Sequence, residues 1–380
     1  MNTTLIGSGV AAWTLVRELR KASPDADICL ITADSGDFYS KPMLSNALAS
    51  GKTAAQLVMT PASKLAAQHN VQLLAHTTVL SINPEHNTLR TDTHTLEYGQ
   101  LVLALGADPI TLPINGDGHP DVLRVNDLND YAAFRARLEG KSNVAILGAG
   151  LIGCEFANDL LKANIQTTVF DLANRPLARL LPEEGSAHLQ NTLEALGVCW
   201  KLGRTITHIQ KEAEHYVITD STGETTTAEL VLSALGLTPR THLAKAAGLD
   251  VKQGIVINAL GQTSNPNIYA LGDCAQYAGH YVLPYIMPVM QAARAIAQTL
   301  SGNPTPIQLP AMPVLVKTPD CPMVISPPLP EQHGTWEITN VPNGLKALFK
   351  SPSGQLLGMA LMGQATQERQ TLAPQLPALI

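Results

Sequence analysis

The chain contains two copies of a strand, glycine turn and helix pattern, and this duplication limits the available folds more than any other feature. The copies read TTLIGSGVAAWTLVRELRK and NVAILGAGLIGCEFANDL. In each, the first glycine permits a tight turn, the second lets backbone approach a diphosphate, and the third position needs only a small residue for helix packing. The two patterns therefore predict two Rossmann-like domains, each binding a dinucleotide.

The helix after each turn favours an anion, because its N-terminal N–H groups are free and its dipole points the positive end at the ligand. In the first copy the third position is alanine, an allowed departure from glycine. The predicted diphosphate contacts of the first copy are Gly7, Ser8, Gly9, Val10, Ala11 and Ala12. Those of the second copy are Gly148, Gly150 and Gly153.

A carboxylate follows the next strand of each unit, where it could bind the adenine ribose. IQTTVFD ends at Asp171, and a carboxylate there repels a 2'-phosphate, which favours NADH over NADPH. The alternative is a solvated loop aspartate, and Arg175 and Arg179 lie just beyond and could meet a phosphate. In the first unit, either Asp34 contacts the ribose or only the backbone around Ala33 does.

Three further apolar segments end in glycine and support the same architecture. LVLALGADP contains Gly106 and LVLSALGLTPR contains Gly236, as expected of buried parallel strands that leave one domain for another. TSNPNIYALGDCA ends near Gly272 and Asp273, a pair that also occurs in common turns without a ligand.

Composition excludes several other functions. The formal net charge is −6 and no basic cluster contains aromatic residues, which argues against nucleic-acid binding. No apolar run approaches the roughly 18 residues of a membrane helix, and MNTTLIGSGV has no basic region before an apolar one, so a cytoplasmic protein is expected. The five cysteines are scattered without short pairings, so no metal site is expected.

Taken in order along the chain, these motifs resemble the two-dinucleotide-binding flavoprotein reductases of the glutathione-reductase class. Four longer strings narrow the resemblance to the rubredoxin-NAD(+) reductase family: SKPMLSNALASGK, GAGLIGCEFANDL, YIMPVMQAARAIAQTLSGN and MPVLVKTPDCPMVISPP. The resemblance implies FAD on the first glycine turn, NADH on the second, and rubredoxin, a small iron protein, as the electron acceptor.

The same resemblance assigns several side chains to the flavin. Asp273 would bind the FAD ribitol, and Lys41 would lie beside the isoalloxazine, where a cation stabilises reduced flavin. Glu155 would reach the flavin site and can pair with Lys41, although a carboxylate in the first helical turn is also favoured structurally. The remaining implied FAD contacts are Lys317 and the backbone of Val79 and Ile286.

The segment DFYSKPMLSN indicates how electrons leave. Disulfide-reducing members of the class carry a redox cysteine pair near this point, whereas this chain has Lys41 and Pro42. Electrons are therefore expected to pass from the flavin directly to an external acceptor. Besides rubredoxin, possible roles are reduction of flavorubredoxin or a ferredoxin, and a non-enzymatic FAD/NADH-binding protein; a link to alkane hydroxylation and a monomeric state are also expected.

The predicted fold is α/β, with two Rossmann-like domains for FAD and NADH and a small α+β C-terminal domain. The FAD domain is expected to be discontinuous because the NADH domain interrupts it. The predicted boundaries are 1–110 and 241–310 for FAD, 111–240 for NADH, and 311–380 for the C-terminal domain. In the last, LKALFK and QLLGMALMG predict a hairpin, followed by a helix near residues 364–371.

Overall fold

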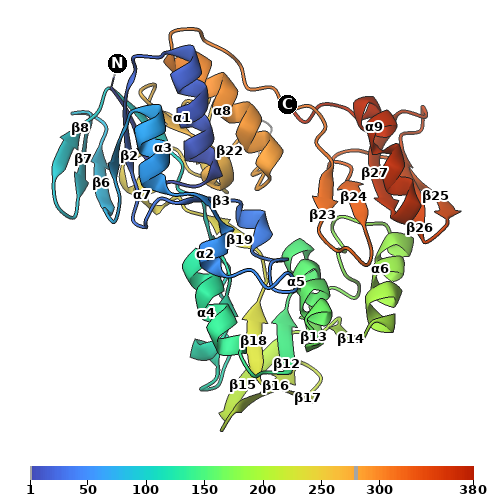
Figure 1. The fold of residues 1–380 in the computed structure, drawn as a ribbon. Coiled ribbons are helices and arrows are strands. Elements are labelled where there is room, and N and C mark those ends of the chain that lie inside the picture. The colour runs from blue at the N-terminus through green and yellow to red at the C-terminus, as the bar shows by residue number, and fades with distance from the viewer. Residues whose placement is uncertain (1, 278–280) are drawn as a thin grey trace.

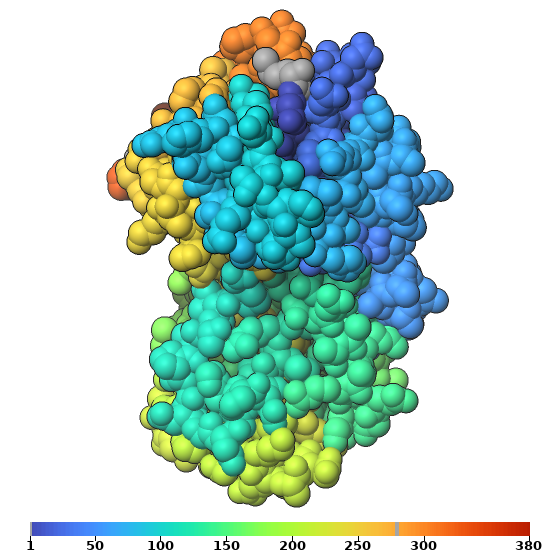
Figure 2. Space-filling model, turned by 90° about the vertical axis from the view of Figure 1, so that its left-hand side faces the viewer, coloured from blue at the N-terminus to red at the C-terminus, as the bar shows by residue number. Residues whose placement is uncertain are grey.

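A computed structural model describes residues 2–277 and 281–380 of the chain. Two parallel sheets with helices on their faces are joined to a third, antiparallel sheet (Figure 1). Viewed from the side, the blue to cyan N-terminal residues share the upper half of the molecule with later, yellow and orange residues, and the teal and green residues between them fill most of the lower half (Figure 2). The predicted α/β fold with two Rossmann-like units and a small third domain is confirmed.

The first parallel sheet has the strand order β21-β9-β1-β2-β5. Most residues of its strands are apolar and buried, because helices cover both faces of such a sheet. The strands are β1 (Asn2–Ile6), β2 (Asp27–Ile31), β5 (Val71–Leu74), β9 (Gln100–Leu103) and β21 (Ile268–Ala270). Its helices are α1 (Val10–Ala22), α3 (Ala62–His69), α7 (His242–Ala246) and α8 (Ile286–Leu300), and α1 and α8 lie side by side (Figure 1).

Short strands extend this first unit. An antiparallel sheet is formed by β6 (Val79–Asn83), β7 (Thr88–Thr91) and β8 (Thr95–Glu97). Two further pairs are β3 (Phe38–Tyr39) with β4 (Val58–Thr60), and β20 (Ile255–Val256) with β22 (Ala275–Gln276). The segment that carries the lysine-proline sequence is a short 3-10 turn, η1 (Lys41–Met43), followed by α2 (Ala54–Leu57).

The second parallel sheet has the order β11-β18-β12-β13-β14. Its strands are β11 (Leu123–Arg124), β12 (Asn143–Leu147), β13 (Gln166–Asp171), β14 (Val198–Leu202) and β18 (Leu230–Ser233). Its helices are α4 (Leu128–Leu138), α5 (Leu151–Lys162) and α6 (Glu183–Ala195). An antiparallel sheet of β15 (Ile206–Glu212), β16 (His215–Asp220) and β17 (Thr225–Ala228) lies at its far end (Figure 1).

The two chain crossings between these units pair with each other. β10 (Ala107–Pro109) and β19 (Leu237–Pro239) form a two-stranded antiparallel ladder. Arg240 Nε donates to Asp108 Oδ1 at 2.6 Å, which links the ends of the two crossings. The connection is therefore a hydrogen-bonded ribbon rather than two separate linkers.

The C-terminal sheet is antiparallel, with the order β23-β24-β27-β26-β25. Its strands are β23 (Val314–Val316), β24 (Met323–Ser326), β25 (Thr335–Val341), β26 (Gly344–Lys350) and β27 (Leu356–Met362). The predicted hairpin is confirmed as the antiparallel pair of β26 and β27. The predicted helix is instead a run of short turns, η4 (Gly363–Glu368), α9 (Arg369–Leu372) and η5 (Ala373–Gln375).

The end of the chain returns to the first unit (Figure 1). Leu379 N donates to Leu309 O at 2.7 Å, and Leu309 N donates to Ile380 O at 2.9 Å. Leu379 and Ile380 pack against the core of the first unit. Apolar residues of the second unit and of the C-terminal sheet share one core cluster, so these two bodies are packed together. Within residues 2–277 and 281–380, no helix is long and apolar enough to cross a membrane.

Candidate dinucleotide and electron-transfer site

Both glycine turns have the backbone that their sequence predicts. Gly7 and Gly148 have φ values of 109° and 110°, which residues other than glycine rarely adopt. A Cβ atom on Gly7 would lie 2.2 Å from the Ala104 carbonyl oxygen, and one on Gly148 would lie 2.5 Å from that of Ala234. Glycine is therefore required here so that each turn can pack against the end of the neighbouring strand.

The second glycine of each turn faces open space. A Cβ atom on Gly9 or Gly150 would meet no atom within 4 Å. These two residues are the N-caps of α1 and α5, and neither helix has a side-chain cap in the part of the chain that the structure describes. Each turn thus combines room beside the backbone with uncapped N–H groups, a combination that fits a diphosphate.

The third position differs between the turns. A Cβ on Gly153 would lie 1.9 Å from the Gly148 carbonyl oxygen, whereas Ala12 of the first turn is fully buried with its methyl group accommodated. Gly272 lies against the same first turn, since a Cβ there would be 3.1 Å from Ala11 Cβ. The structure therefore brings the first glycine motif together with the Gly272 turn.

The two predicted ribose carboxylates are held differently. Asp34 Oδ1 accepts hydrogen bonds from Ser8 Oγ at 3.0 Å, Thr32 Oγ1 at 2.6 Å and Gly36 N at 2.9 Å. Its Oδ2 has no donor among the described residues. A carboxylate fixed through one oxygen keeps the other available as an acceptor, which supports Asp34 itself rather than only the backbone near Ala33.

Asp171 ends β13 and is fixed through both oxygens. Its Oδ2 accepts from Ala149 N of the second glycine turn at 2.6 Å, and its Oδ1 accepts from Ala173 N at 2.7 Å. Each oxygen retains a second acceptor position. The carboxylate is consequently locked against the glycine turn, as a ribose-binding group requires.

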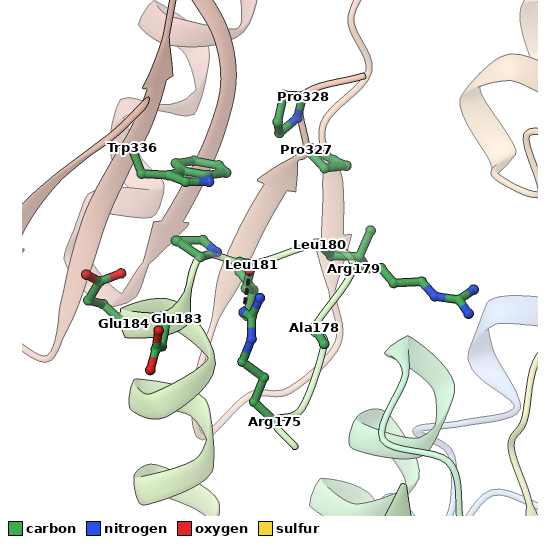
Figure 3. Close-up of a pocket in the computed structure, with 11 residues that line it drawn as sticks. Arg175, Ala178, Arg179, Leu180, Leu181, Glu183, Glu184, Pro327, Pro328 and Trp336 are labelled. Carbon is green, nitrogen blue, oxygen red and sulfur yellow. Dashed lines mark hydrogen bonds between the residues drawn. The ribbon is translucent and has the colours of Figure 1, made fainter. Parts of the chain in front are cut away.

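The two arginines beyond Asp171 have separate environments (Figure 3). Arg175 donates to the Leu181 carbonyl oxygen at 2.8 Å and to Ser186 Oγ at 3.1 Å, so its guanidinium is engaged in hydrogen bonds to the loop and helix that follow it. Arg179 points away from Arg175, and both arginines line a cleft of about 480 Å³ together with Pro327, Pro328 and Trp336. Arg179 is exposed and is the arginine left to meet a phosphate.

Lys41 is paired with Asp273, which joins two predicted flavin contacts. Lys41 Nζ lies 3.9 Å from Asp273 Oδ2. Burial lowers the pKa of Lys41, while the Asp273 carboxylate opposes that shift. Burial likewise raises the pKa of Asp273, with Lys41 acting in the opposite direction. Desolvation therefore disfavours the charged form of each group, and the opposite charge of its partner favours it.

Glu155 has other partners than the one expected for it. Its Oε1 accepts from Lys317 N at 2.9 Å, and its Oε2 lies 3.2 Å from Lys317 Nζ and accepts from Ser45 Oγ at 2.5 Å. The expectation of a Glu155–Lys41 pair is wrong for this structure, because Glu155 forms its ion pair with Lys317 of the C-terminal domain instead. Glu155 and Lys317, both predicted flavin contacts, are nevertheless brought together.

The remaining predicted residues lie at element boundaries. Val79 begins β6 and Ile286 begins α8. Gly106 and Gly236 have φ values of 72° and 107° and flank the ribbon between the two parallel sheets. A Cβ on Gly106 would meet nothing within 4 Å, so backbone is exposed to open space there as well.

Sequence reasoning missed the polar residues that connect α5 to its neighbours. Asp159 accepts from Leu48 N at 2.8 Å and Ala49 N at 3.1 Å. Asn158 Nδ2 donates to Asp320 Oδ2 at 2.5 Å in the C-terminal unit. A signal existed, because polar residues at i, i+3 and i+4 on an otherwise apolar helix predict a face buried against hydrogen-bonding partners.

None of the cysteines lies at the position of a redox pair. Four of them, Cys29, Cys154, Cys274 and Cys321, are buried, and Cys199 on β14 is exposed. Burial raises the pKa of Cys29, Cys274 and Cys321 to about 11. These thiols are consequently protonated and unreactive near neutral pH.

Comparison with known proteins agrees with this geometry. Residues 1–299 match the family model described as pyridine nucleotide-disulphide oxidoreductase. The chain belongs to the pyridine nucleotide-disulphide oxidoreductase family. Residues 306–376 match a second model, the rubredoxin binding C-terminal domain. The family binds FAD and NADH, and the two glycine turns provide the room and the N–H groups for both.

Individual relatives extend the match over the whole chain. The rubredoxin-NAD(+) reductase of Acinetobacter baylyi is 44% identical over 99% of this chain and 98% of its own. The nitric oxide reductase FlRd-NAD(+) reductase of Aeromonas hydrophila is 38% identical over 98% of this chain and 96% of its own. The crystal structure of the covalent putidaredoxin reductase–putidaredoxin complex has a TM-score of 0.89 at 26% identity, covering 99% of this chain and 94% of that one.

Proposed function

We propose that this protein is a reductase that passes electrons from NADH to rubredoxin. The observation that carries the proposal is the rubredoxin-binding C-terminal domain, whose Lys317 contacts the helix of the second glycine turn through Glu155. The C-terminal domain is therefore hydrogen-bonded directly to the unit proposed to bind NADH. A dithiol relay is absent from the lysine-proline segment, which agrees with direct transfer to an external carrier.

Bound FAD supplies the chemistry, since a flavin takes two electrons as a hydride and releases them singly. The protein's own groups position and stabilise. The first glycine turn and Asp34 would hold the FAD diphosphate and ribose, and Gly272 and Asp273 would close the site from the opposite side. The second turn and Asp171 would hold NADH. Lys41 would supply positive charge that favours the reduced, more negative flavin.

Several narrower statements belong to this proposal. NADH is preferred over NADPH because Asp171 places a carboxylate where a 2'-phosphate would lie. The domain boundaries proposed are those expected from the sequence, with FAD bound by 1–110 and 241–310 and NADH by 111–240. We further propose a monomer that acts in the cytoplasm and supports alkane hydroxylation through its rubredoxin.

Anaerobic stopped-flow measurement tests the proposal. The purified protein is reduced with NADH and then mixed with oxidised rubredoxin, or separately with a plant-type ferredoxin. Rapid reoxidation by rubredoxin alone is expected. Slow reoxidation by both carriers would refute the acceptor assignment, and failure of NADH to bleach the flavin absorbance would refute the reductase assignment as a whole.

A second acceptor is supported by the 38% identity to the nitric oxide reductase FlRd-NAD(+) reductase. Flavorubredoxin, the alternative acceptor expected from the sequence, is therefore the second candidate. Comparing the reoxidation rates with free rubredoxin and with flavorubredoxin in the same apparatus separates the two, because the physiological acceptor should give the higher second-order rate constant.

A further inference from the structure

Ser45 lies on the segment that follows Lys41 and is buried, with 2% of its surface exposed. Its hydroxyl is 3.3 Å from the Pro42 carbonyl oxygen and 2.5 Å from Glu155 Oε2 on α5. The second contact spans 110 positions of the sequence. It therefore joins the lysine-proline segment to the helix of the second glycine turn.

The carboxylate that receives this bond is itself buried, with its side chain 4% exposed. Lys317 supplies its other donors, through N at 2.9 Å to Oε1 and through Nζ at 3.4 Å to Oε1 and 3.2 Å to Oε2. In the described part of the chain, Ser45 is the donor to Glu155 that does not belong to the C-terminal unit. A buried carboxylate depends strongly on each of its donors, because bonds to a charged group are roughly twice as strong as neutral ones.

The backbone around Ser45 is fixed independently. Asp159 lies one turn further along α5 and accepts from Leu48 N at 2.8 Å and from Ala49 N at 3.1 Å. The segment is thus attached to the helix at two successive turns, by Glu155 through a hydroxyl and by Asp159 through two amides. The second attachment keeps the Ser45 hydroxyl within reach of Glu155 even when neighbouring side chains move.

We propose that Ser45 is a positioning residue for the reduction of the flavin by NADH. Its hydroxyl holds Glu155 between the Lys41 segment and Lys317. Glu155 is the fifth residue of α5, just past the first turn in which the sequence placed it, and it follows the uncapped N-terminus that fits the NADH diphosphate. Without the hydroxyl, Lys317 is the only donor left to the carboxylate, which turns toward the C-terminal unit and away from the Lys41 segment. This inference rests on the proposed use of NADH.

The test compares Ser45→Ala with Ser50→Ala under anaerobic rapid mixing. Ser50 is a matched control, since it lies on the same segment and its hydroxyl donates to Ala47 O at 3.0 Å, three residues back, without contacting Glu155. Rates are measured on the flavin-loaded fraction across a range of NADH concentrations. Ser45→Ala should lower the limiting rate of flavin reduction roughly tenfold, as expected for losing one bond to a charged group, while the NADH dissociation constant changes less than about twofold.

Two further variants distinguish positioning from a structural role. Ser45→Thr keeps the hydroxyl and should retain most of the wild-type rate. Adding Ser45→Ala to Glu155→Gln should cause no further loss, because the group that Ser45 positions has already been altered. A wild-type rate in Ser45→Ala, an equal loss in Ser50→Ala, or additive losses in the double variant would each overturn the proposal.

The outcomes remain separable from those of the proposed function. If wild-type flavin is reduced by NADH but not reoxidised by rubredoxin, the acceptor assignment fails and the Ser45 comparison still stands. If NADH does not reduce the wild-type flavin, the proposed function fails and the positioning role fails with it. If wild-type flavin is reduced normally and the Ser45 variants match it, only the positioning role is refuted.

Discussion

Replacing Gly150 with alanine should separate ligand binding from folding. Gly150 has φ −77° and ψ −171°, a conformation that any residue adopts, and an added Cβ would meet no atom within 4 Å. The free energy of unfolding should therefore change by less than about 1 kcal/mol. In the bound state the methyl group fills the space that the NADH diphosphate needs, and such overpacking costs about 1–3 kcal/mol. NADH should bind roughly 5- to 150-fold more weakly.

The assay measures flavin reduction against NADH concentration, which gives the dissociation constant, together with a thermal melt and the FAD content. Gly148→Ala is the contrasting variant, because its φ of 110° and the 2.5 Å approach to Ala234 O predict lost stability. Gly9→Ala is the matched variant for the other turn and should lower FAD content instead. Unchanged NADH affinity in Gly150→Ala would refute the assignment of this space to the diphosphate.

Three further predictions follow from the charges and the chain end. Lys41→Met should keep FAD bound but slow flavin reduction or shift the flavin potential. Since burial lowers the pKa of Lys41, the rate of flavin reduction in the wild type should fall as pH rises through a value below the usual range of lysine. Stopped-flow pH profiles of the variant should lack that step. Hydrogen bonds from Thr222 hold the pKa of Asp220 well below its usual range, so its contribution to stability is present above about pH 4 and is lost as pH falls further; Asp220→Asn should melt at a lower temperature at pH 7, with the difference shrinking in acid. Removing the last two residues leaves the buried Leu309 backbone without partners and should lower the free energy of unfolding in urea by roughly 1–3 kcal/mol; an unaltered midpoint would contradict a stabilising role for these hydrogen bonds.

The glycine turns could be predicted from sequence because their requirements are local. A positive φ and an uncapped helix are properties of a few consecutive residues, so the roles of Gly7 and Gly148 can be recognised from the local sequence. The β26–β27 hairpin was predictable for the same reason, since two apolar segments flank a short polar turn that contains glycine.

The partner of Glu155 could not be predicted, because the contact joins residues 162 positions apart. The family resemblance implied Lys41 as the partner, but a sequence contains no distance between a lysine on one unit and a carboxylate on another. Which lysine reaches Glu155 depends on how the C-terminal sheet packs against α5. That packing arises from many shared apolar contacts rather than from any one motif.

The distribution of the thiols makes the native chain a ready subject for site-directed spectroscopy. Cys199 is the exposed cysteine and the other four are buried with protonated thiols, so a maleimide probe should attach at one place without any engineering. That place is on β14, an edge strand of the second parallel sheet. A fluorophore there, with the flavin as the energy acceptor, would report the distance between the two dinucleotide-binding units during a catalytic cycle.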